Sequence, residues 1–205
     1  MKRVAVAGVA LLLATSQSAC LFRASRDSFR YYTLGSSADP PVKSASSLTV
    51  GLGPVTLPGY LSRPGLVTRV DDTRVRYSEG DLWAEPLGKQ FTRTLSEDLS
   101  RALGGARIID YAWYPSAPID VAVAVNVLAF EVDTTGAATL TAGWALRDPQ
   151  SRKVGYEGQS SIVEPAGETP GKAATGEAAV PALSRALAQL SREIAVAIVT
   201  NWRSR

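Results

Sequence analysis

The stretch VAVAVNVLAFEVDTTGAATLTAGWALR, residues 121–147, predicts two antiparallel strands joined by a tight turn. Valines at positions 121, 123, 125 and 127 alternate, so they share one face of a strand over residues 119–132. Phe130 falls on the opposite face, and a β-bulge near Leu128 would return it to the apolar side. The DTTGA turn leads to a second alternating strand at residues 139–147. A third strand at residues 153–163 completes a meander.

Two amphipathic helices accompany this meander. Apolar residues recur every four positions over residues 87–103, and two glycines then end the helix. Another apolar stripe runs along residues 178–202. Short strands are expected at residues 48–55, 66–70, 74–77 and 107–109. The sequence therefore predicts a single α+β domain: an antiparallel sheet with two amphipathic helices packed on one face.

Residues 1–19 have the features of a lipoprotein signal peptide. Two basic residues precede eleven apolar or small residues, too few to span the roughly 30 Å core of a bilayer. The only cysteine, Cys20, follows small residues and resembles the lipobox cysteine of bacterial lipoproteins, which implies a lipid on its sulfur. Two alternatives stay open. One is cleavage after Ser18 without lipidation, since Gln17 stands where a lipobox usually has leucine; the other is a retained membrane anchor.

Residues 20–47 are rich in Ser, Ala and Pro and predict a flexible tether between the lipidated N-terminus and a domain at residues 48–205. Within the tether, FRYYTLG at residues 29–35 forms either a short strand of the domain or a linker. Leu21, in place of aspartate after the cysteine, favours the outer membrane facing the periplasm. The net charge of +3 includes Lys2 and Arg3 of the signal; without them it is +1, so a nucleic-acid partner is not expected.

The composition argues against catalysis. The chain has no histidine, the commonest general base and metal ligand, and its single cysteine is Cys20. The acidic pairs Asp71–Asp72 and Glu97–Asp98 are adjacent residues whose side chains do not converge. We therefore expect neither an enzyme nor a cofactor or metal site.

Two segments contain the candidate functional residues: PGYLSRPGLVTR, residues 58–69, and DLWAEPL, residues 81–87. Prolines stiffen the first segment, and its two arginines can present guanidinium forks to carboxylates of a partner. The alternative is that these arginines are solvated and that Trp83 packs in the core. The candidates for partner contact are Tyr60, Leu61, Arg63, Arg69 and Trp83, and those for a structural role are Pro58, Pro64, Glu85, Pro86 and Leu87.

The run GPVTLPGYLSRPGLVTR, residues 53–69, followed by RVRYSEGDLWAEPL, residues 74–87, resembles the PqiC-like, ABC-type transport auxiliary lipoproteins of MCE-type (mammalian cell entry) systems. The resemblance extends from YYTLG at residues 31–35 to the final helix. It implies an outer-membrane lipoprotein, anchored through Cys20, that faces the periplasm and hydrolyses nothing.

The resemblance also implies a partner, an MCE-domain protein that carries hydrophobic substrates such as phospholipids between membranes, and a homo-oligomeric ring around it. The chain would then act as the docking subunit of the transport system and support membrane integrity. Two other functions stay open: a lipid-binding module that shuttles acyl chains, and another envelope-assembly lipoprotein such as a secretin pilot or an outer-membrane biogenesis component.

Overall fold

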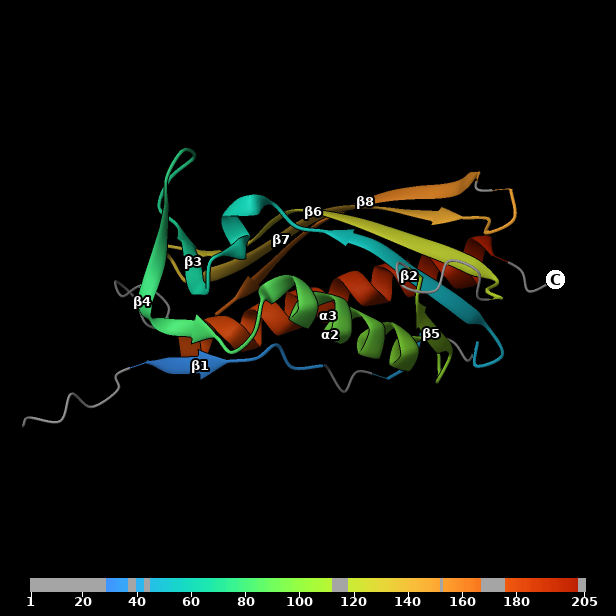
Figure 1. The fold of residues 1–205 in the computed structure, drawn as a ribbon, viewed down its shortest axis with the longest axis horizontal. Coiled ribbons are helices and arrows are strands. Elements are labelled where there is room, and N and C mark those ends of the chain that lie inside the picture. Colours follow the sequence, from blue (N-terminus) through green and yellow to red (C-terminus); the bar gives the residue numbers. More distant parts are fainter. Residues whose placement is uncertain are drawn as a thin grey trace, which may run out of the picture.

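The structure is a computed structural model that describes residues 29–36, 40–42, 45–111, 118–151, 153–166 and 176–202. In this part of the chain, eight strands form one sheet and two α-helices lie together on one of its faces (Figure 1). The elements are β1 (Arg30–Tyr32), β2 (Thr49–Thr56), the 3-10 helix η2 (Gly59–Ser62), β3 (Gly65–Arg69), β4 (Val75–Trp83), α2 (Leu87–Ala102), β5 (Arg107–Asp110), β6 (Val121–Asp133), β7 (Ala137–Arg147), β8 (Val154–Pro165) and α3 (Gly176–Asn201).

The prediction of one α+β domain with two helices is confirmed, but the prediction of a purely antiparallel sheet is wrong. The sheet is mixed: the pairs β1–β4, β2–β5, β2–β6 and β3–β6 are parallel, and β3–β4, β6–β7 and β7–β8 are antiparallel. Three of the parallel pairs, β2–β5, β2–β6 and β3–β6, arise because helix α2 carries the chain back along the sheet between β4 and β5, so that β5 and β6 run in the same direction as β2 and β3. The strands of the fourth parallel pair, β1 and β4, both precede α2.

The meander of β6, β7 and β8 agrees with the alternation in the sequence. The register between β6 and β7 shifts between Val127 and Ala129, which confirms the expected bulge. The shift turns Leu128 outward, where it is 49% exposed, and returns Phe130 to the helix-covered face. The Phe130 ring meets Phe91 of α2 edge to face, with 5.2 Å between ring centroids. One inserted residue thus keeps both halves of a long strand packed on the helices.

Helices α2 and α3 close the core. The predicted stripe of α2 is buried from Leu87 to Leu99, and α3 buries a matching row that includes Leu187 and Ile194. Burial of each such side chain stabilises the fold by about 1.5–3 kcal/mol relative to exposure. The two helices contact each other as well as the sheet (Figure 1).

The folded domain begins before residue 48. β1 pairs in parallel with β4, so the strand alternative for residues 29–35 is confirmed. Leu34 is 5% exposed, and its backbone N–H donates to the side-chain oxygen of buried Gln90 at 2.9 Å. Val42 and Ala45 donate backbone hydrogen bonds to the C-terminal end of α2. Much of the expected tether is therefore packed on the domain.

The remaining N-terminal predictions lie outside the described residues. These are the signal peptide at residues 1–19, the lipidation of Cys20, and the tether at residues 20–28, 37–39 and 43–44. They stay predictions.

Candidate partner-contact surface

The segment PGYLSRPGLVTR leads from the end of β2 through η2 into β3. β2 and β3 lie on the same edge of β6. β7 occupies the other edge of β6, while β2 pairs with its first half and β3 with its last residues. Between the paired positions Thr56–Asn126 and Thr68–Val132, β6 advances six residues and the β2–β3 chain advances twelve. The additional residues between β2 and β3 leave the sheet and form η2, which Figure 1 shows as a short coil between the two strands.

Prolines and one leucine fix this excursion. Pro58 immediately precedes η2 with φ −59°, and its carbonyl accepts a hydrogen bond from the N–H of Leu61 at 3.0 Å. The Leu61 side chain is 2% exposed and belongs to the core. Pro64 ends the excursion, and its carbonyl accepts a bond from the Trp83 N–H at 2.7 Å. Because a proline has restricted φ, the segment emerges with a defined backbone path.

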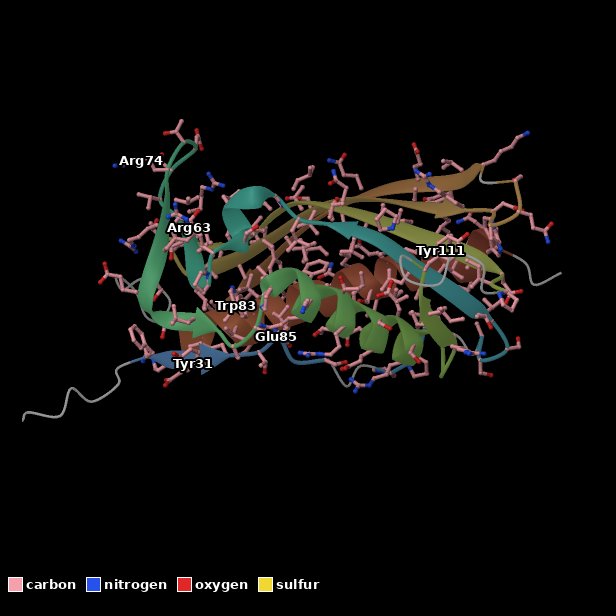
Figure 2. The ribbon with its side chains drawn as sticks, in the orientation of Figure 1. Tyr31, Arg63, Arg74, Trp83, Glu85 and Tyr111 are labelled. Carbon is pink, nitrogen blue, oxygen red and sulfur yellow. The ribbon has the colours of Figure 1, made fainter. Side chains whose placement is uncertain are left out.

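Arg63 projects from this fixed path toward solvent. Its guanidinium carbon lies 4.7 Å from the centroid of the Tyr77 ring, a stacking geometry that favours arginine. Tyr77 is held in turn, because its hydroxyl donates to the backbone oxygen of Tyr60 at 3.0 Å. Arg63 itself is exposed. Figure 2 shows it beside β3, away from the helices. The stack orients the guanidinium and leaves its donor edge accessible.

Arg69 has a different environment. Its Nε lies 2.6 Å from Glu131 Oε1 and its Nη2 lies 3.2 Å from Oε2, a two-point ion pair. The Glu131 side chain is 6% exposed and that of Arg69 is 32% exposed. The bond to Glu131 raises the pKa of Arg69 above its ordinary value. This geometry assigns the Arg69 charge to the fold.

Tyr60 lies over the same ion pair. The guanidinium carbon of Arg69 is 5.8 Å from its ring centroid. Burial raises the pKa of Tyr60 to about 12, and the nearby Glu131 carboxylate adds to the shift. Among the described residues, the buried Tyr60 hydroxyl has no hydrogen-bond partner of normal geometry. Tyr60, Arg63, Arg69 and Tyr77 therefore form one cluster. In it the Arg63 guanidinium stacks on Tyr77 with no carboxylate partner among the described residues, and that of Arg69 binds Glu131.

The second motif, DLWAEPL, is packed rather than displayed. Trp83 is 6% exposed and lies in the core, as the alternative interpretation had it. Pro86 stands at the N-terminal boundary of α2, and Leu87 behind it is 4% exposed. The Glu85 carboxylate pairs with Arg93 at 2.5 Å, and its backbone oxygen accepts a bond from Gln90.

Sequence reasoning missed Asp81, the first residue of that motif. Its carboxylate, in a residue only 8% exposed, is 2.6 Å from Arg30 Nε of β1 and 3.2 Å from the backbone N–H of Gly176, where α3 begins. Asp81 thus joins β4 to the N-terminal strand and to the last helix. An acidic residue inside an otherwise apolar strand end was the signal for such a role, but its partners lie 51 and 95 positions away.

An open groove of about 780 Å³ lies elsewhere, between the β7–β8 pair and α3. Its apolar lining comes from Trp144, Tyr156, Val196 and Ala197. The charged groups around it are already engaged. Arg185 pairs with Glu164 at 3.2 Å, and Glu193 accepts a hydrogen bond from Ser160 at 2.5 Å.

The described residues contain no cluster of three or more His, Cys, Asp or Glu side chains arranged to hold a metal ion. In the same residues, neither helix combines the length and the apolar character that a membrane crossing requires.

Known proteins resemble this chain in sequence. The intermembrane transport lipoprotein PqiC of Escherichia coli (strain K12) is 34% identical over 82 residues, which cover 37% of this chain and 41% of PqiC. PqiC of Shigella flexneri matches to the same extent. The matched part spans less than half of the length of these relatives.

Solved structures share the fold. A crystal structure of an uncharacterized protein has a TM-score of 0.65 at 23% identity and covers 82% of this chain and 97% of its own. Protein XCC0632 from Xanthomonas campestris also has a TM-score of 0.65, at 18% identity, with 84% and 96% covered. Finally, the profile of the family described as ABC-type transport auxiliary lipoprotein component matches residues 32–195, from β1 into α3. The chain therefore belongs to the family of PqiC-like, ABC-type transport auxiliary lipoproteins.

Proposed function

We propose that this chain is the docking subunit of an MCE-type system that moves phospholipids between membranes. Its lipidated Cys20 would anchor it to the outer membrane, with the domain in the periplasm. Family membership supports a role as an auxiliary component of transport. The two PqiC relatives carry the name intermembrane transport lipoprotein, which supports transport between membranes. A homo-oligomeric ring around the MCE partner is part of the same proposal.

The observation that carries the docking role is the presentation of Arg63. In the PGYLSRPGLVTR segment, Leu61 is in the core and Arg69 is held by Glu131. Arg63 is the arginine of this segment that is exposed and stacked on an aromatic ring. A guanidinium held in one orientation loses less side-chain entropy on binding a carboxylate. Arg63 therefore has the properties of an interface anchor for an acidic group of the partner.

The test replaces Arg63 by a photo-reactive amino acid in the full chain and irradiates intact cells. We expect a covalent adduct with an MCE-domain protein. In parallel, Arg63→Glu should reduce co-purification of that protein by about tenfold or more, because arginine anchors in interfaces commonly contribute about 2 kcal/mol. The urea unfolding midpoint should fall only slightly, since the Arg63 side chain is exposed and its stack on Tyr77 is worth about 0.5–1 kcal/mol.

Arg107→Glu is the matched control, because Arg107 is another exposed arginine, on β5. It should leave co-purification unchanged. Equal losses in both variants would mean a general effect of charge. A loss of stability well above about 1 kcal/mol for Arg63→Glu would mean that the side chain mainly serves the fold, and either result contradicts the docking surface.

The groove between β8 and α3 supports a second candidate function, a lipid-binding module. Its volume of about 780 Å³ exceeds the roughly 300 Å³ at which ligand pockets begin. Its charges pair with each other or with protein atoms, so the groove offers mainly apolar surface to a ligand. An uncharged acyl chain fits that description.

A further inference from the structure

The strand β1 presents two different faces. Arg30 and Tyr32 face the domain: Arg30 binds Asp81, and the Tyr32 ring lies against the start of α3 at Gly176. Tyr31, between them, points the other way, as alternation in a strand requires, and Phe29 immediately precedes the strand. Phe29 is 50% exposed and Tyr31 is 60% exposed. Two large aromatic side chains are thus displayed together at the edge of the sheet that is nearest in sequence to Cys20.

The length of the preceding chain limits how far this edge can lie from a lipid on Cys20. Phe29 lies nine positions after Cys20. Each residue spans at most about 3.3–3.6 Å, so the edge lies within roughly 32 Å of the anchor whatever path the chain follows. The connecting sequence also contains Leu21 and Phe22 beside the anchor, and two arginines against one aspartate over residues 21–28. This composition is compatible with an anionic lipid surface.

We propose that Phe29 and Tyr31 form a membrane-contact surface, with their rings at the headgroup level of the leaflet that holds the Cys20 lipid. This inference rests on the proposed anchor. Aromatic side chains, tyrosine above all, favour this depth because the ring is apolar and the hydroxyl stays hydrated. The contact would supplement the acyl chains and restrict how the domain tilts on the membrane. Figure 2 shows Tyr31 beside β1 and Arg63 beside β3, so the two surfaces can serve different partners at once.

The experiment uses the single cysteine of the chain. Once Cys20 carries its lipid, the thiol of a Tyr31→Cys variant is the only one available for labelling. The lipidated full chain is labelled with a polarity-sensitive fluorophore. It is then placed in vesicles of phosphatidylethanolamine and phosphatidylglycerol that contain brominated acyl chains. We expect strong quenching at position 31. Val163→Cys is the control, because Val163 is 62% exposed on β8, and its label should be quenched several-fold less. Equal quenching at both positions would overturn the proposal.

A second measurement is independent of lipidation. In the full chain with Cys20→Ser, sedimentation with the same vesicles should fall about fivefold or more when Phe29→Ser and Tyr31→Ser are introduced together. Val163→Ser should not change it. If wild-type Cys20 itself accepts the fluorophore, the anchor fails, while this second measurement still decides the contact surface.

Self-association is the competing explanation for exposed aromatic residues. If the Phe29→Ser and Tyr31→Ser variant loses an oligomeric state in solution and keeps its sedimentation with vesicles, the surface joins copies of the chain. The membrane-contact proposal is then wrong.

Discussion

At the scale of single residues, the two arginines of PGYLSRPGLVTR have opposite environments. Arg63 is exposed and stacked on Tyr77, whereas Arg69 neutralises a carboxylate that is almost completely buried. In the sequence both arginines lie in the same proline-containing segment, so both were equal candidates for partner contact. The difference arises from Glu131, which lies 62 positions from Arg69 and reaches it only because β3 and β6 are paired. No local pattern contains that information.

Arg69→Met should therefore destabilise the fold without any partner present. Removal of the guanidinium leaves the Glu131 carboxylate buried and unpaired, a change that costs about 3–5 kcal/mol for fully buried pairs. Because Arg69 is 32% exposed, water compensates in part, and we expect about 2–3 kcal/mol in urea unfolding.

Two comparisons check this assignment. Arg74→Met removes an arginine whose pair with Asp71 is exposed, and it should cost less than about 1 kcal/mol. Addition of Glu131→Gln to Arg69→Met should recover part of the lost stability, since an amide costs less to bury than a charge. If Arg69→Met does not change the free energy of unfolding, the ion pair does not stabilise the fold, and Arg69 is again a candidate for partner contact.

At the scale of elements, the sequence predicts local patterns better than long-range strand pairing. The leucine row of α2 and the alternation from Val121 to Arg147 predicted their elements correctly, bulge included. The parallel pairing of β2 and β3 with β6 was not predicted. Parallel partners are joined by long crossovers, and no turn motif marks their register. β1 was recognised only as an alternative, because three residues in a polar segment give a weak signal.

Leu34→Ala tests whether the segment after β1 belongs to the folded core. Leu34 is 5% exposed, so its truncation should leave a cavity and lower the free energy of unfolding by about 2–4 kcal/mol. Tyr31→Ala, at a position 60% exposed, should lower it by less than about 1 kcal/mol. Equal unfolding midpoints for Leu34→Ala and the wild type would mean that this segment is a flexible tether, as the sequence predicted.

At the scale of the whole molecule, the candidate surfaces lie on different elements. The Arg63 surface belongs to η2 and its neighbours, the aromatic surface to β1, and the groove to β7, β8 and α3. The Arg63 surface could be predicted from the sequence as one segment, because that segment combines prolines with arginines. The groove could not be predicted. Its lining joins Tyr156 of β8 to Val196 of α3, and only the packed structure places them together.

Val196→Arg tests the groove. An arginine in the apolar lining should lower the fraction of protein that carries a phospholipid in native mass spectra by about fivefold or more, because the charge must be desolvated when an acyl chain binds. Val163→Arg is the control at an exposed position outside the groove, and lipid should persist there. If the wild-type protein carries no lipid under the same conditions, the lipid-binding candidate is rejected.

The central place of β6 has a consequence for the order in which the chain can fold. Val50 pairs with Val121 and Thr68 with Val132, so both strands that precede α2 on this edge depend on a strand made much later in synthesis. Pairing between such distant positions is slow, and strands that await a partner expose unpaired edges. β2 and β3 become parts of one sheet only after β6 has emerged, although β3 has β4 and β2 has β5 as earlier partners. A chain that ends before β6 can still pair β3 with β4 and β2 with β5, but these pairs stay unconnected and expose the strand edges that β6 covers in the complete sheet.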